Sequence, residues 1–143
     1  MKYTIYKILL ISIFSLTFNS CNNDDDNIES QSLNGKYNGT FTVEYLNGDT
    51  FSNSVSVNLT KKNNYESSGN GNSNDFYPAG ENGTYEINNS EINFSDSNIW
   101  LAHFDWNLIL AGEYKYSKNG NELIISANRT ELGIYKYELT KEW

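Results

Sequence analysis

Apolar and polar residues alternate along residues 36–46 (KYNGTFTVEYL), and this period-two pattern returns through most of the chain beyond residue 33. One face of the stretch would carry Tyr37, Phe41 and Val43, while Thr40 and Thr42 would lie on the other. Successive side chains of a β-strand point to opposite faces, whereas those of a helix repeat every 3.6 residues. The pattern therefore predicts a β-strand with one buried face.

Turn signals separate the later alternating segments. Between strand-like runs lie NGD at residues 47–49, KNN at 62–64, NNS at 88–90 and KNGN at 118–121. Short turns of this kind join antiparallel neighbours. About eight to nine such strands, with no strand–helix alternation, predict an all-β antiparallel meander. We expect a closed barrel, and a two-sheet β-sandwich fits the same pattern.

The segment at residues 97–112 (SNIWLAHFDWNLILAG) is ambiguous. Both a strand and a helix would place Trp100, Phe104 and Leu108 on one side. Because the surrounding pattern is all β, we expect two extended pieces that bend near residues 103–105.

The first 20 residues have the features of an export signal. Lys2 and Lys7 give a positive start, and the apolar run ILLISIFSLTF follows at residues 8–18. A membrane-spanning helix needs about 20 apolar residues, so this run is too short to be one. We therefore expect residues 1–20 to be a signal peptide; a buried helix of a cytosolic protein is the alternative.

Cys21 is the only cysteine, and it follows the apolar run directly. A single cysteine in an exported chain cannot form an internal disulfide. The stretch LTFNSC resembles the lipobox of bacterial lipoproteins, although Phe18 and Asn19 depart from the usual residues. The resemblance implies that the signal is cut before Cys21 and that this residue carries acyl chains that anchor the protein in a membrane.

An acidic segment, NNDDDNIESQS, follows the cysteine at residues 22–32. Its composition predicts a solvated tether. Acidic residues directly after a lipidated cysteine resemble the signal that sends Bacteroidota lipoproteins to the outer face of the outer membrane, and Asp24, Asp25 and Asp26 would carry it here. We expect a lipidated tether at residues 21–32 and a folded domain at 33–143.

The net charge limits the kinds of partner. It is −8 for the whole chain, and Lys2 and Lys7 both precede Cys21, so the remainder is more acidic still. Nucleic acids and anionic lipid surfaces are bound through basic faces. We therefore expect no nucleic-acid partner, and we expect membrane attachment through the lipid on Cys21.

Few residues suggest catalysis. His103 is the only histidine, so it has no second ligand of the kind that a zinc site needs. On a strand it would share a face with Asp105, but no G-x-S-x-G motif supplies a nucleophile. Glu86 and Glu91 flank an exposed turn, where two carboxylates do not act as acid and base. We expect no metal, no cofactor and no enzymatic activity.

The predicted domain resembles the lipocalin-like domains of Bacteroidota lipoproteins. The similar stretches are LNGKYNGTFTV, GTYEINNSEINF and GEYKYSKNGNELIIS, which begin at residues 33, 83 and 112. Lipocalins open with Gly-x-Trp, whose Trp stacks on an Arg near the last strand. Tyr37 takes the Trp position here, and Arg129 would be its partner and close the barrel floor. The resemblance implies a small hydrophobic or amphipathic ligand.

Aromatic residues are frequent beyond Cys21 and have two interpretations. Most fit core and cross-strand packing, but inward tyrosines also suit a cavity that holds an amphipathic ligand. The residues that would line it are Tyr37, Phe41, Tyr85, Trp100, Trp106, Tyr114, Tyr116, Tyr135 and Tyr137. The alternative function is a non-enzymatic protein- or glycan-interaction module on a solid sandwich. It predicts exposed side chains at Trp100, Trp106 or Trp143.

Overall fold

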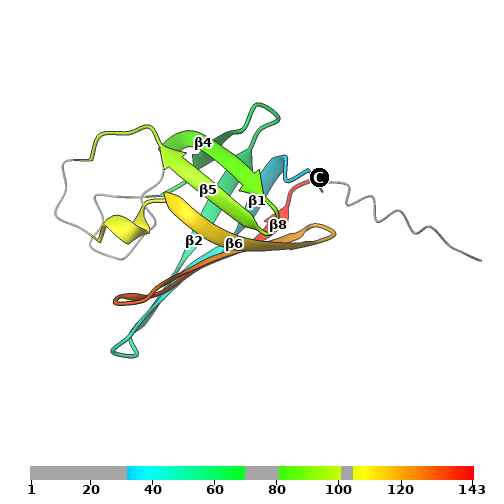
Figure 1. Cartoon of the computed structure of the whole chain (residues 1–143). Coiled ribbons are helices and arrows are strands. Elements are labelled where there is room, and N and C mark those ends of the chain that lie inside the picture. The colour runs from blue at the N-terminus through cyan, green and yellow to red at the C-terminus, as the bar shows by residue number, and fades with distance from the viewer. Residues whose placement is uncertain (1–31, 70–80, 101–104) are drawn as a thin grey trace, which may run out of the picture. The chain divides into compact units, whose positions relative to one another are not determined.

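Eight antiparallel strands close into a barrel in the computed structural model of the chain, which describes residues 32–69, 81–100 and 105–143 (Figure 1). The strands are β1 (Gly35–Tyr45), β2 (Thr50–Leu59), β3 (Asn64–Ser67), β4 (Glu81–Asn88), β5 (Glu91–Asp96), β6 (Gly112–Asn119), β7 (Glu122–Arg129) and β8 (Gly133–Lys141). Each pairs with its neighbours in sequence, and β1 also pairs with β8. The predicted all-β antiparallel meander is confirmed, and the fold is the barrel, not the two-sheet sandwich.

Alternating side chains of the strands form the core. In β1 the side chains of Tyr37, Phe41 and Val43 are fully buried, as the period-two pattern predicts. Burying an apolar side chain of this size contributes about 1.5–3 kcal/mol. Inward-facing residues from all eight strands form one core cluster, which includes the aromatic rings described below.

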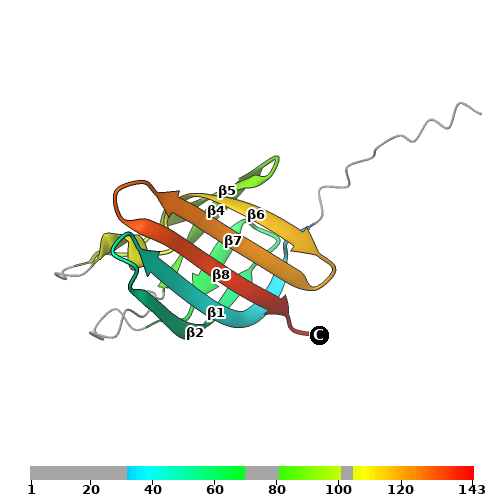
Figure 2. The ribbon, with the colours of Figure 1, turned by 90° about the horizontal axis from the view of Figure 1, so that it is seen from below.

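The β1–β8 seam closes the barrel. Figure 2 shows β2, β1, β8, β7 and β6 side by side in this order. In the seam Gly39 pairs with Leu139, and a Cβ atom on Gly39 would lie 1.9 Å from the carbonyl oxygen of Glu138. Glycine is therefore required at this position so that the two backbones can approach.

The two ends of the barrel are connected differently. At one end, which we call the turn end, residues 60–63, 89–90 and 120–121 link the strands, and β1 begins and β8 ends there. Asn63, Asn89 and Gly120 have φ values of 59°, 54° and 56°, the left-handed conformation typical of tight turns. At the other end, the loop end, the links are residues 46–49, 68–80, 97–111 and 130–132.

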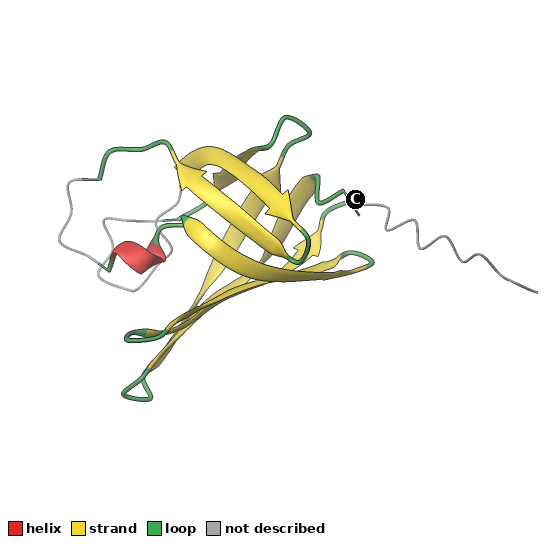
Figure 3. Cartoon of the chain, in the orientation of Figure 1, coloured by secondary structure: helices red, strands yellow, loops and turns green. Residues whose placement is uncertain are grey.

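The ambiguous segment at 97–112 contains a 3₁₀ turn, η1 (Trp106–Leu108), the one helical segment in the described ranges (Figure 3). The prediction of an extended piece here is wrong for residues 106–108. The cause is local, because the Asp105 side chain accepts a hydrogen bond from the backbone N–H of Asn107 and caps the turn.

Several predicted features lie outside the described residues. They are the signal peptide at 1–20, the lipidation site Cys21, the acidic residues Asp24, Asp25 and Asp26, and His103. Within the described ranges, no helix has the length and apolar character needed to cross a membrane.

Candidate functional site

Aromatic rings fill the barrel interior along a continuous path. Ring centroids of successive members lie 4.7–6.4 Å apart. From the loop end inward the path contains Tyr45, Tyr135, Phe41, Tyr137, Tyr114, Phe94 and Tyr65. An eight-stranded barrel has room inside for its own side chains or for one small ligand. Much of the interior is therefore occupied by rings, and polar groups decide where a ligand could bind.

Tyrosine hydroxyls satisfy backbone groups at the turn end. The hydroxyl of Tyr37 donates a hydrogen bond to the carbonyl oxygen of Leu33 at 2.8 Å, and that of Tyr85 donates to the carbonyl oxygen of Thr60 at 2.9 Å. Leu33 is itself buried. Both tyrosines were predicted to line a ligand site. Tyr37 instead holds the segment that leads into β1, and Tyr85 holds the turn between β2 and β3.

The predicted pair of Tyr37 and Arg129 is not formed. In the β1–β8 register Tyr37 lies opposite Lys141, whose Nζ is 6.0 Å from the centroid of the Tyr37 ring. Arg129 ends β7 opposite Gly133, and Gly133 lies opposite Tyr45 at the loop end. The antiparallel register therefore separates the pair by the length of β1.

Asp105 connects η1 to the barrel at the loop end. Its Oδ2 accepts hydrogen bonds from the hydroxyls of Tyr135 at 2.6 Å and Tyr45 at 2.9 Å. Its Oδ1 accepts from the backbone N–H of Asn107 at 2.9 Å. This carboxylate therefore holds η1 against the loop end of the barrel.

These hydrogen bonds shift the pKa values of the groups that share them. Burial alone would raise the pKa of Asp105, but hydrogen bonds from Tyr135, Asn107 and Tyr45 together lower it. Burial and the bond to Asp105 raise the pKa of Tyr45 to about 12, and the same causes raise that of Tyr135. Asp105 is therefore charged and both tyrosines are neutral at neutral pH.

Arg129 continues the inward face of β7. Leu123, Ile125 and Ala127 are buried at alternate positions, and Arg129 follows at the next one. Its guanidinium Cζ lies 5.2 Å from the centroid of the Tyr114 ring, and its Nη2 donates a hydrogen bond to a backbone carbonyl oxygen at 3.2 Å. Its Nε is buried without a hydrogen-bond partner, and no ion pair involves it in the described part of the chain.

Two tyrosine hydroxyls beside Arg129 also lack an acceptor for their protons. Tyr114 and Tyr137 are 1% and 0% exposed, and neither hydroxyl donates a hydrogen bond. Burial raises the pKa of both phenols, while the positive charge of Arg129 opposes the rise in each case, and for Tyr114 a hydrogen bond with Arg129 opposes it as well. The guanidinium therefore acts on both phenols, and three donors without acceptors gather in one place.

We call Tyr45, Asp105, Tyr114, Arg129, Tyr135 and Tyr137 the loop-end cluster. The structure brings three of the predicted ligand-lining residues, Tyr114, Tyr135 and Tyr137, into it. Phe41 packs against two of them in the core, with ring centroids 4.7 Å from Tyr137 and 6.4 Å from Tyr135.

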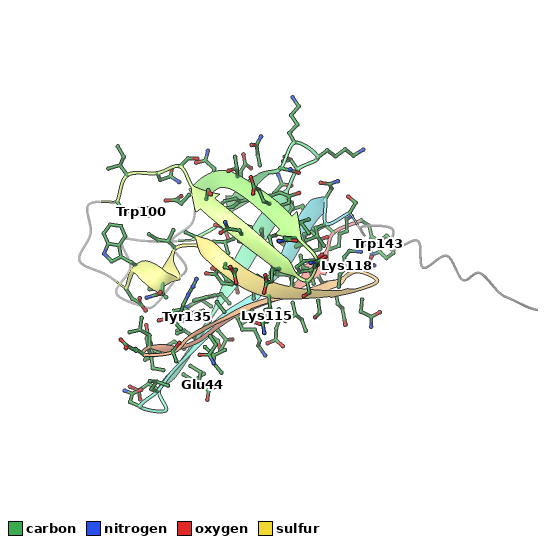
Figure 4. All side chains as sticks on the ribbon, in the orientation of Figure 1. Glu44, Trp100, Lys115, Lys118, Tyr135 and Trp143 are labelled. Carbon is green, nitrogen blue, oxygen red and sulfur yellow. The ribbon has the colours of Figure 1, made fainter. Side chains whose placement is uncertain are left out.

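Other predicted lining residues lie elsewhere. The hydroxyl of Tyr116 donates to the carbonyl oxygen of Asn89 in a turn at the turn end. Trp100 is half-buried and donates from its ring nitrogen to Asp96, whereas Trp106 is 57% exposed. Figure 4 shows Trp100 and Tyr135 at the loop end and Trp143 at the opposite end.

The sequence did not point to Tyr45 and Asp105 as partners, since 60 residues separate them. The position of Arg129 did have a signal in the sequence. It follows Leu123, Ile125 and Ala127 at two-residue spacing. Because side chains alternate between the two faces of a strand, this spacing alone places the Arg129 side chain inside the barrel.

Comparison with protein-family models, with curated proteins and with solved structures finds no match to this chain. The barrel and the loop-end cluster are therefore the features from which a function can be inferred.

Proposed function

We propose that this protein is a lipid-anchored, non-enzymatic binding protein whose barrel takes one small amphipathic molecule at the loop end. One observation carries the binding half of this proposal. The hydroxyls of Tyr114 and Tyr137 and the Nε of Arg129 are buried donors without acceptors. Buried polar groups in native proteins are nearly always hydrogen-bonded, so a group of three without partners needs an explanation.

The surroundings of these donors suit an amphipathic ligand. The donors lie among aromatic rings, including Phe94, whose centroid is 5.8 Å from that of Tyr114. Small-molecule sites are typically apolar surfaces with a few convergent polar groups that fix orientation. A ligand with one polar end and one apolar end would satisfy both parts of the site.

Native mass spectrometry tests the binding half. The full chain would be extracted from membranes, exposed to a small-molecule extract of the cells that make it, and measured in native and denatured form. We expect an excess mass in the native form that is lost on denaturation. Equal native and denatured masses would contradict the proposal.

The anchoring half is supported by the sequence around Cys21 (LTFNSC) and the acidic residues after it. The chain enters the barrel at Gly35, at the turn end. We propose that the anchored protein is exposed at the outer face of the outer membrane.

Cell fractionation tests the anchor. Cys21→Ala should move the protein out of the membrane fraction or leave its signal uncut, and unchanged membrane fractionation would exclude lipid anchoring. Replacing Asp24, Asp25 and Asp26 with Ala should reduce the access of external protease to the protein in intact cells. Unchanged access would remove the export role of these residues.

A second candidate function, binding of a protein or glycan, is favoured by exposed apolar residues at the loop end. Leu46 is 70% exposed and Trp106 is 57% exposed. A variant in which Trp106 is the single tryptophan tests this function. A glycan or protein that covers Trp106 should shield it from acrylamide and so reduce the quenching of its fluorescence. Quenching that no glycan or protein partner changes would leave only the small-molecule function.

A further inference from the structure

The barrel satisfies its other inward tyrosine hydroxyls. Those of Tyr37, Tyr65 and Tyr85 donate to backbone carbonyl oxygens at 2.7–2.9 Å. Those of Tyr45 and Tyr135 donate to Asp105, as described above. Among the buried side chains of the described residues, the groups without partners are therefore limited to one place, beside Arg129.

The three groups have one property in common. The hydroxyls of Tyr114 and Tyr137 and the Nε of Arg129 each have a hydrogen that is donated to no acceptor, and the guanidinium is positive. What the site lacks is an acceptor that all three groups can reach. Asp105 does not fill this role, because its carboxylate already accepts from Tyr45, Tyr135 and Asn107.

Contacts on two sides position the guanidinium. Its Cζ lies 5.2 Å from the centroid of the Tyr114 ring, and its Nη2 donates a hydrogen bond to the carbonyl oxygen of Ala111 at 3.2 Å. Both contacts leave the Nε of Arg129 without a partner.

We propose that Arg129, Tyr114 and Tyr137 bind the carboxylate end of the small amphipathic ligand. A carboxylate offers two oxygens with several lone pairs, enough to accept from a guanidinium and two phenols. The apolar part of the ligand would contact the surrounding rings. This inference rests on the proposed function and adds the chemical class of the ligand's polar end.

In the free protein, the hydroxyl of Tyr137 should lower stability. Removing a hydroxyl that has a partner lowers stability, whereas removing one that is buried without a partner relieves a cost. Tyr137→Phe should therefore leave the melting temperature unchanged or raise it. Tyr85→Phe is the matched control, because the same substitution removes a hydroxyl that bonds Thr60, and it should lower the melting temperature.

The binding experiment uses the full chain in phospholipid nanodiscs, with hexanoate as the probe and neutral hexanamide as its matched control. Hexanoate should raise the melting temperature of the wild type and of Tyr85→Phe, and hexanamide should not. Tyr137→Phe should weaken hexanoate binding about tenfold, the effect of one lost charge-assisted hydrogen bond. Arg129→Gln should weaken it further, because the positive charge is lost.

Three results would overturn the inference. The first is a Tyr137→Phe protein that melts as early as Tyr85→Phe, which would show that the hydroxyl has a partner in the free protein. The second is equal binding of hexanoate and hexanamide, and the third is unchanged hexanoate affinity in both variants. If either of the last two results accompanies an excess native mass in the earlier experiment, the proposed ligand function stands and only its carboxylate is wrong.

Discussion

The turn end and the loop end of the barrel are built from the same residue types but use them differently. At the turn end, Tyr37 and Tyr85 donate to backbone oxygens, and short turns link the strands. At the loop end, two tyrosines share one carboxylate, and two more, beside an arginine, have hydroxyls that donate to no acceptor. The difference lies in hydrogen bonding, since both ends are lined by buried aromatic rings.

This difference gives the two ends different contributions to the free energy of unfolding. A buried donor without an acceptor costs about 1–3 kcal/mol, so the loop end carries a cost that the turn end avoids. Functional sites commonly carry such costs, and the rest of the fold compensates for them. We infer that the turn end holds the barrel together and that the loop end is where it binds.

The largest effect should follow Tyr37→Ala at the turn end. The change removes a fully buried ring and leaves the carbonyl oxygen of Leu33 without its partner. We expect a loss of about 3–5 kcal/mol in the free energy of unfolding, measured by chemical denaturation. Tyr37→Phe keeps the ring and should lose only about 1 kcal/mol. Similar losses for the two variants would contradict a structural role for the ring.

A smaller loss should follow Asp105→Ala at the loop end. It removes the shared acceptor of Tyr45 and Tyr135 and the cap of η1. We expect a loss of about 2–3 kcal/mol, with faster amide hydrogen exchange at the loop end than at the turn end. Asp105→Asn keeps an acceptor and a cap and should lose less. Uniformly faster exchange over both ends would show that they do not open separately.

The same carboxylate should make the loop end sensitive to acid. The pKa of Asp105 is lowered in the fold from its ordinary value of 3.8. A lowered pKa adds stability that is complete above about pH 5 and is lost as the pH falls through the folded pKa. The stability difference between wild type and Asp105→Asn should therefore shrink between about pH 5 and pH 2. A difference that stays constant over this range would contradict the lowered pKa.

The smallest effect should come from a turn residue. Asn89 has a φ of 54°, which alanine adopts less readily than asparagine and glycine adopts freely. Asn89→Ala should cost about 1 kcal/mol, and Asn89→Gly should stay within about 0.5 kcal/mol of the wild type in thermal unfolding. A larger loss for glycine than for alanine would contradict the role of the left-handed conformation.

The sequence was sufficient to predict the strands and most turns, because both depend on local patterns. The alternation around Tyr37, Phe41 and Val43 specified which face is buried, and the structure agrees. The choice between barrel and sandwich depended on the pairing of β1 with β8. No local pattern encodes that pairing, so the sequence left both folds open.

The candidate site was less predictable for the same reason. Tyr114, Tyr135 and Tyr137 were among the expected lining residues, but the contact of Asp105 with Tyr45 joins distant segments. The expected pair of Tyr37 and Arg129 came from a family pattern and is wrong because the antiparallel register puts the two residues at opposite ends. In the segment at 97–112, a side-chain cap outweighed the periodicity.

The position of β1 has a mechanical consequence. The chain enters the barrel at Gly35, and β1 is hydrogen-bonded along its length to β2 on one side and to β8 on the other. A pull along the strand from the residues that precede it would load both ladders in shear, so many hydrogen bonds would have to break together. The barrel should therefore resist unfolding by a force that acts through the segment before β1 more strongly than by one that peels a single ladder open.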